Sequence, residues 1–236
     1  WNELEVDEEL KLQAEDDFCR DIERKLRRTL YAWKHMRADM VVEPYLGLPK
    51  IIRGTEENLG ISPREQRAVT DPERPVVGHY YFDQFQTEED LAKIRTPEVA
   101  LDADATARAA EMAGELFRDV LEVRMEGHCP RFTPWDRIVE WRGAQNTLVD
   151  LAMRPEFMHA IMSRTTRAFL SRLDQLEEQG LLGYGQGVIK NSGAFTDELP
   201  AAGFDPEKPR TKDIWSTDTA ITIILLMKGV AAATHE

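Results

Sequence analysis

The residues most able to do chemistry lie in one loop, which follows the short apolar segment 122–126. This loop contains His128, Cys129 and Arg131, and Trp135 lies where the next helix should start. A histidine titrates near neutral pH and can move a proton, and a cation close to a helix N-terminus can hold a carboxylate or a phosphate. We therefore expect His128 to be a catalytic residue, and Arg131 and Trp135 to bind substrate.

A metal site cannot be identified from the cysteines and histidines of the sequence. His128 and Cys129 are adjacent, and successive side chains of an extended chain point in opposite directions, so we do not expect them to bind one metal ion. The second cysteine, Cys19, is distant in the sequence and has no partner motif. Two isolated cysteines indicate a reducing, cytoplasmic environment rather than a disulfide framework.

Glu43 is a second candidate catalytic residue. It follows Met40–Val42, which resembles a short buried strand that Pro44 would stop. A carboxylate at the C-terminal end of a barrel strand faces the active-site mouth, but it can equally accept hydrogen bonds from backbone N–H groups. Both interpretations of Glu43 remain open.

Two further segments carry side chains that could line a substrate pocket. His79 precedes Tyr80 and Tyr81, which adds two phenol groups to a titratable ring, although aromatic packing with His79 bonded to the backbone explains the cluster better on sequence alone. Asn191 and Asp197 lie in a polar loop after the expected strand 184–189 and could form a pocket wall or a solvated connection.

The spacing of apolar residues, together with helix caps and breakers, predicts the elements that position these groups. We expect helices at 8–33, 87–95, 102–121, from Thr133 and Pro134 onward, and from Pro155 to Gly180, strands at 122–126 and 184–189, and a small hairpin excursion within 47–85. We expect the side chain of Thr133 to cap its helix. Strands that alternate with helices in this way indicate a parallel sheet.

Length and charge limit the kinds of partner. The 236 residues suffice for one domain, 1–236, and the net charge of −13 disfavours nucleic acid and anionic membrane surfaces as partners. The apolar run Ile221–Met227 is shorter than the roughly 20 residues that a membrane-spanning helix needs. We expect a small molecule to be the main ligand.

Several stretches together resemble the uroporphyrinogen decarboxylase superfamily. They are MVVEPYLGLPK, GHYYFDQFQTEEDLAKIRTPEV, NSGAFTDELP and the long segment TPWDRIVEWRGAQNTLVDLAMRPEFMHAIMSRTTRAFLSRLDQLEEQGLL. The resemblance is strongest to a branch associated with corrinoid-dependent methyl transfer. It implies an α/β fold, the (β/α)8 TIM barrel, with the pocket at the C-terminal strand ends, and it implies further βα units in the C-terminal third that this chain lacks.

Two departures from the family pattern bear on the reaction. The arginine-rich Met-Arg-Gln-Ala-Gly-Arg motif that holds substrate carboxylates is replaced by TLYAWKHMRADMVVEP, and the His-x-Cys pair that binds zinc in the related methyltransferases is not found. The missing arginine motif favours methyl transfer involving a corrinoid protein in one-carbon metabolism, for which the resemblance implies zinc and a partner-bound corrinoid as cofactors.

Two alternatives remain open at this stage. The first is a decarboxylase of a tetrapyrrole or a smaller carboxylic acid, with Arg131 as the carboxylate anchor. The second is a non-catalytic module that binds a tetrapyrrole or a corrinoid partner through Tyr80, Tyr81 and Trp135. The candidate partners are thus a small-molecule or tetrapyrrole substrate, a corrinoid protein and a second copy of the chain in a homodimer.

Overall fold

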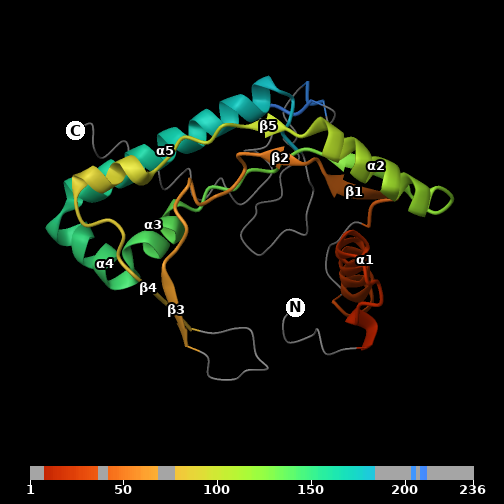
Figure 1. Cartoon of the computed structure of the whole chain (residues 1–236), viewed down its shortest axis with the longest axis horizontal. Helices are drawn as coiled ribbons and strands as arrows, with labels where there is room; N and C mark the ends of the chain where they lie inside the picture. Colours follow the sequence, from red (N-terminus) through yellow and green to blue (C-terminus); the bar gives the residue numbers. More distant parts are fainter. Residues whose placement is uncertain (1–7, 37–41, 69–77, 184–202, 206–207, 212–236) are drawn as a thin grey trace. The chain divides into compact units, whose positions relative to one another are not determined.

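A computed structural model describes residues 8–36, 42–68, 78–183, 203–205 and 208–211 (Figure 1). The chain divides into two compact units, one of Trp1–Glu43 with Arg67–Tyr80 and one of Pro44–Gln66 with Tyr81–Glu236. Helices and short strands occur together, which confirms a mixed α/β class. The described residues form small two-stranded sheets and no closed barrel.

The first unit contains η1 (Glu8–Leu10) and α1 (Asp17–His35). The expected helix from Glu8 therefore begins later, because Asp16 is its N-cap and accepts a hydrogen bond of 3.0 Å from the Cys19 N–H group. Glu23 accepts hydrogen bonds from the backbone N–H groups of Gln13 and Ala14, which fixes the preceding residues outside the helix. These bonds and Arg27 lower the pKa of Glu23 to about 2.

The apolar face predicted for α1 is only partly buried. Ile22 and Tyr31 are buried, whereas Leu30 and Trp33 of the same predicted face are exposed. Of the basic residues in this part of α1, Lys25 is exposed, whereas Arg24, Arg27 and Arg28 are half-buried, and Arg27 pairs with Glu23 at 2.7 Å.

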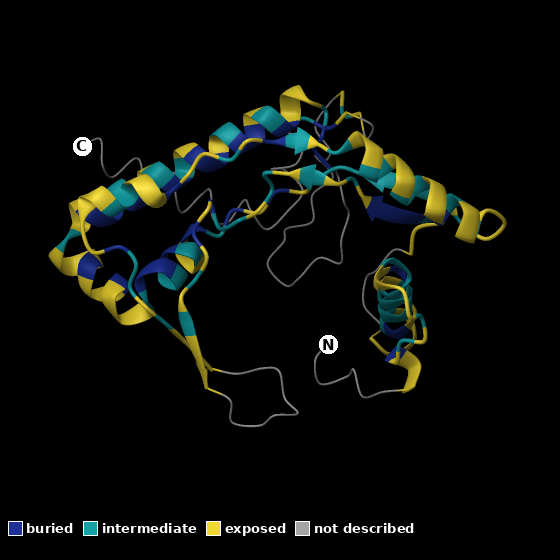
Figure 2. Cartoon of the chain, in the orientation of Figure 1, coloured by how far each residue is buried: buried dark blue, intermediate teal, exposed yellow. Residues whose placement is uncertain are grey.

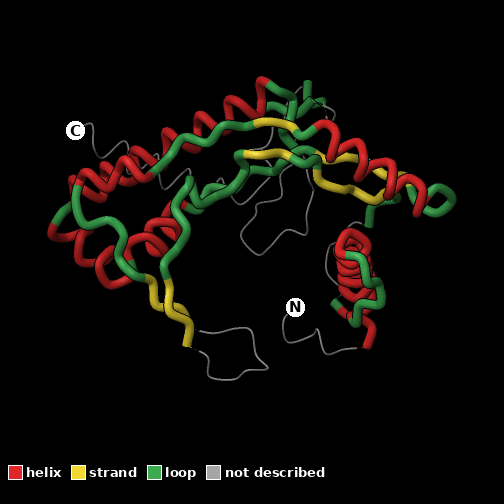
Figure 3. The backbone as a smooth tube through the Cα atoms, viewed as in Figure 1, coloured by secondary structure: helices red, strands yellow, loops and turns green. Residues whose placement is uncertain are grey.

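The strands that the structure describes are all short (Figure 3). They are β1 (Tyr45–Pro49), β2 (Ile52–Arg53), β3 (Glu65–Ala68), β4 (Gly78–Tyr81), β5 (Ala100–Leu101) and β6 (Glu122–Glu126). β1 and β6 are parallel, with Gly47 opposite Arg124. β2 pairs with β5 in the antiparallel sense, and β3 pairs with β4. The parallel sheet and the bounds of β6 are as predicted, and small strands instead of helices occupy the described part of 47–85.

The strand predicted at Met40–Val42 lies largely outside the described residues, and its described residue Val42 is not in a strand. The first strand that the structure describes is Tyr45–Pro49, and Met40 and Val41 lie outside the described residues. Leu46 and Leu48 alternate onto one buried face, whereas Val42 is exposed. Glu43 is therefore exposed at the N-terminal side of β1, not at the C-terminal strand end that motivated its selection as a catalytic residue.

The helices of the second unit are η2 (Glu88–Lys93), α2 (Ala103–Phe117), α3 (Pro134–Arg142), α4 (Ala144–Met153) and α5 (Pro155–Glu178). The long helix predicted from Pro155 is confirmed, and Gly180 beyond its end has a φ of 63° in the left-handed region. α2 packs against β6 but ends at Phe117, before the predicted Leu121. The segment predicted as helix 87–95 is the 3₁₀ helix η2.

The main core of the second unit lies between α3, α5 and the segments that precede them. The buried face of α5 runs along its length (Figure 2) and carries Phe157, Met158, Ile161, Thr165, Ala168, Phe169, Leu173 and Leu176. Trp141 of α3 is fully buried in the same core and stacks on Phe85, with ring centroids 5.6 Å apart. This packing supplies the hydrophobic stabilisation that the sheets are too small to give.

A buried ion-pair cluster joins α3 to α4. Arg142 donates from Nε to Oδ2 of Asp150 over 2.8 Å, and a second nitrogen of the same guanidinium donates to Asp83. Arg154 lies 3.9 Å from the same Asp150 oxygen. The cluster positions α3, and with it the loop that precedes α3.

The burial pattern of α4 is the reverse of that of an ordinary surface helix. Its two buried residues are polar, Thr147 and Asp150, whereas Leu148 and Met153 are 69% and 74% exposed. Val149 and Leu151 are exposed as well.

Among the residues that the structure describes, no helix combines the length and apolar character needed to span a membrane.

Candidate functional site

The loop after β6 is held by a parallel bridge to the end of the α5 segment. The His128 N–H group donates to the Leu181 carbonyl over 2.8 Å, and the Gly183 N–H group donates to the His128 carbonyl over 2.8 Å. The two backbones approach closely, since a Cβ atom on Gly127 would lie 2.3 Å from the Leu182 carbonyl oxygen. β6 is parallel to β1, and His128, just after β6, forms a parallel bridge with Leu182.

His128 is half-buried at the C-terminal end of β6. Burial lowers the pKa of its imidazole, and the positive charge of Arg172 lowers this pKa further. Its Nε2 atom is buried and makes no hydrogen bond within the described part of the chain. His128 is therefore neutral at pH 7, and one of its ring nitrogens is enclosed without a hydrogen-bond partner among the described residues.

Arg172, on the buried face of α5, is 2% exposed. Its guanidinium donates to the backbone carbonyls of Thr55 (3.2 Å), Glu56 (3.1 Å) and Arg131 (3.4 Å). Desolvation lowers the pKa of this guanidinium, and the charges of Glu57 and Glu56 oppose that shift. No described carboxylate forms a salt bridge with Arg172, and its Nε atom has no hydrogen-bond partner among the described residues.

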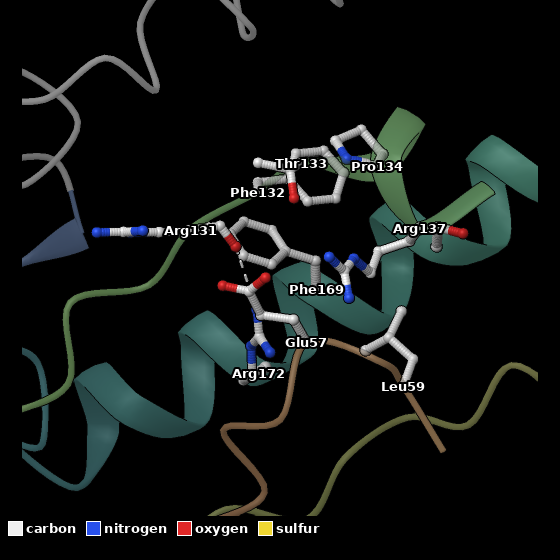
Figure 4. Close-up of a pocket in the computed structure, with 10 residues that line it drawn as sticks. Glu57, Leu59, Arg131, Phe132, Thr133, Pro134, Arg137, Phe169 and Arg172 are labelled. Carbon is white, nitrogen blue, oxygen red and sulfur yellow. Dashed lines mark hydrogen bonds between the residues drawn. The ribbon is translucent and has the colours of Figure 1, made fainter. Parts of the chain in front are cut away.

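A small hollow lies where this guanidinium meets the loop before α3 (Figure 4). It is lined by Glu57, Leu59, Arg131, Phe132, Thr133, Pro134, Arg137, Thr165, Phe169 and Arg172. The free space of about 10 Å³ is room for one water-sized group. Because Glu57 is half-buried and Arg131 is exposed, the rim of the hollow reaches the surface.

Arg137 brings a second guanidinium to the hollow. Its Nη1 atom lies 2.8 Å from Oε2 of Glu140, one turn along α3. Its Nε atom is buried and, within the described residues, has no hydrogen-bond partner. Burial raises the pKa of Glu140, and the charge of Arg137 opposes this shift. Two arginine Nε donors, from Arg137 and Arg172, thus belong to side chains that line one hollow.

Arg131 contributes to this region through its backbone and not through its charge. Its carbonyl oxygen accepts from Arg172, whereas its side chain points away from the hollow (Figure 4). Trp135 is 45% exposed on the first turn of α3. Thr133 is the N-cap residue of α3 and Pro134 is its first residue, as predicted, although the Thr133 side chain makes no cap hydrogen bond.

The remaining candidate residues are not part of this hollow. His79 and Tyr80 are exposed on β4 and belong to the first unit, and Tyr81 is half-buried at the end of that strand. Asn191 and Asp197 lie outside the described residues. Of the predicted site residues, the structure brings His128 into the electrostatic range of Arg172 and places the backbone of Arg131 against the same guanidinium.

The sequence analysis missed Arg172 and Arg137. A signal for Arg172 was present, because it lies four residues after Ala168 and four before Leu176, both on the apolar stripe of α5. A charged residue within such a stripe must be buried with partners or bind a ligand. No comparable signal identified Glu57, which reaches the hollow from a loop far away in the sequence.

The residues around His128 do not fit a zinc site. His128 is half-buried near a positive charge, and the neighbouring Cys129 is exposed. Within residues 8–36, 42–68, 78–183, 203–205 and 208–211, no group of three or more His, Cys, Asp or Glu side chains is close enough to hold a metal ion. We therefore assign no chemical step to a metal.

Comparisons of the chain with protein-family models, curated proteins and solved structures give no match. The roles of His128 and Arg172 must therefore be argued from their own geometry.

Proposed function

We propose that this chain is a uroporphyrinogen decarboxylase-like enzyme with a (β/α)8 barrel whose active face lies at the C-terminal ends of its parallel strands. The observation that carries the proposal is the order of parallel pairing, β1 with β6 and then His128 with Leu182. Successive parallel neighbours joined by helices are the building pattern of that barrel. The loop after β6, with His128, occupies the position where such barrels carry reactive groups.

For the reaction, our first candidate is methyl transfer involving a corrinoid protein in one-carbon metabolism. Support comes from the family resemblance and from the N-terminal stretch TLYAWKHMRADMVVEP, which lacks the arginine motif for polycarboxylate substrates. When bound, a corrinoid supplies a cobalt atom that carries the methyl group. The role that we propose for this chain is to bind the methyl donor or acceptor beside the neutral ring of His128.

This candidate is tested with the purified protein and a methylated corrinoid. We expect methyl transfer to a small acceptor, measured as loss of the methyl-cobalt absorbance, and slower transfer in His128→Ala. Bound zinc is measured in the same preparation by metal analysis. An intact protein that neither transfers methyl groups nor contains zinc would exclude this reaction.

A second candidate is decarboxylation of a tetrapyrrole or a smaller carboxylic acid. It is favoured by the buried guanidinium of Arg172 near His128, because a cation stabilises a carboxylate, and Arg172 takes the role first assigned to Arg131. In this reaction the bond to the carboxyl carbon breaks, carbon dioxide leaves, and the electron pair that stays on the substrate takes up a proton from water, which the neutral ring of His128 is proposed to orient as a hydrogen-bond acceptor. Release of carbon dioxide from a panel of carboxylic acids tests it, and full activity in His128→Ala would contradict this role.

A further inference from the structure

The hollow between α5 and the start of α3 combines two buried hydrogen-bond donors with apolar walls. The Nε atoms of Arg172 and Arg137 are buried and make no hydrogen bond within the described residues. Arginine nitrogens can only donate, so the missing partner is an acceptor. The walls are the side chains of Leu59, Phe132, Pro134 and Phe169.

The charge of Arg172 calls for a partner as well. A buried cation is costly unless it is paired, and its hydrogen bonds to the carbonyls of Thr55, Glu56 and Arg131 carry no countercharge. Glu57 and Glu56 act on it only through their fields, and no described carboxylate is in ion-pair contact with it. The expected partner is therefore an acceptor with a negative charge.

We propose that this hollow binds the carboxylate of a small acid, one oxygen of which enters between Arg172 and Arg137 while the apolar body of the acid rests against Phe132 and Phe169. The space for one water-sized group suits a single carboxylate oxygen better than a tetrahedral phosphate. The exposed rim near Arg131 leaves room for the rest of the acid. The site extends the second candidate reaction, which also makes Arg172 the carboxylate anchor, but binding is measured without turnover, so the absence of decarboxylation would not by itself exclude the site.

Glu57 and Glu140 determine how strongly the hollow attracts an anion. Glu57 lies on the lining and repels a carboxylate, and Glu140 partly neutralises Arg137 across 2.8 Å. Two arginines and two acids make the local charge close to balanced. Binding therefore depends on hydrogen-bond geometry more than on net charge, and it should become tighter when Glu57 loses its charge.

The test follows the arginine Nε–H resonances of the full-length protein by NMR during titration with acetate and with benzoate. We expect the signals of Arg172 and Arg137 to move in a saturable way, and benzoate to bind more tightly than acetate because of the apolar walls. Inorganic phosphate is the control. Shifts with phosphate alone, or no shift with either acid, would overturn the proposal. So would signals of the free protein that show each arginine Nε–H group already bonded to an acceptor of the chain, or to a water molecule that the acids do not displace.

Matched variants separate this site from general charge effects. Arg137→Gln should weaken benzoate binding by about tenfold or more, because a charge-assisted hydrogen bond contributes at least that factor. Glu57→Gln should strengthen binding, and Arg131→Ala should leave it unchanged because that side chain points away (Figure 4). Arg172→Lys should also weaken binding, but Arg137→Gln decides the question if loss of the Arg172 contacts unfolds the protein. Equal affinity in Arg137→Gln and in the unaltered protein would contradict the site.

Discussion

Burial lowers the pKa of the His128 imidazole, and the positive charge of the Arg172 guanidinium lowers it further, although the two residues lie on different elements. Both side chains carry a buried nitrogen without a hydrogen bond inside the described ranges. The charge of Arg172 on α5 therefore influences the protonation of His128 in the loop after β6.

Removing the charge of Arg172 should raise the pKa of His128. Arg172→Met removes the repulsion between two positive charges, so the protonated imidazole becomes less unfavourable, although the effect of burial remains. Arg172→Lys keeps the charge and should keep the pKa low. The pKa is read from the His128 ring proton shifts across a pH titration. The same low pKa in the methionine variant would show that burial alone sets it.

The low pKa of His128 should make the folded protein less stable in mild acid. In the folded state the pKa lies below the ordinary value of 6.5, so at pH values between the two the unfolded chain binds the proton more readily. The free energy of unfolding therefore falls as the pH drops below about 6.5. Urea unfolding at a series of pH values measures it, and His128→Gln should reduce the slope in this interval. An unchanged slope in that variant would assign the effect to other groups.

The ion-pair cluster of α3 and α4 should be essential for the second unit. Asp150→Ala leaves Arg142 buried with one of its two carboxylate partners missing, which should cost about 3 kcal/mol. The matched control is Glu122→Ala, which breaks the exposed pair with Arg124 and should change stability little. Denaturant midpoints of both variants provide the comparison. Similar small effects would mean that water reaches the cluster.

The bridge between His128 and Leu182 should tolerate no side chain at Gly183. A Cβ atom there would lie 2.3 Å from the Gly127 carbonyl oxygen, so Gly183→Ala should destabilise the protein by about 1–3 kcal/mol. Gly114→Ala is the control, because nothing lies within 4 Å of its Cβ position in α2 and the change should stabilise the helix by roughly 0.5–1 kcal/mol. Thermal unfolding distinguishes the two signs. A neutral Gly183→Ala would indicate that the two backbones are not held this close.

The sequence predicts the long periodic elements of this protein well. Pro155, the apolar stripe of α5 and Gly180 together specify where that helix starts, which face is buried and where it ends. β1 was not predicted, because Tyr45–Pro49 contains Gly47 and Pro49 and has low strand propensity, whereas burial of Leu46 and Leu48 favours a strand there. In so short a strand, tertiary burial outweighs local propensity.

The candidate site was predictable only in part, for a physical reason. His128 and Arg131 could be identified because their loop follows a strand. The burial of Arg172 was predictable from its place in the apolar stripe of α5, but its partners were not, because they are carbonyl groups of the distant residues Thr55 and Glu56. These contacts join segments that are far apart in the sequence, so the sequence alone does not show that they meet.

The exposed apolar side of α4 has a consequence for how copies of this protein behave in concentrated solution. The net charge of −13 keeps molecules apart at low ionic strength, while Leu148 and Met153 offer a neutral surface where that repulsion is weakest. Added salt shortens the range of the repulsion to about 8 Å at 0.15 M and leaves the apolar attraction in place. The colloidal stability of the protein should therefore fall as salt is added, and Met153→Lys should restore it.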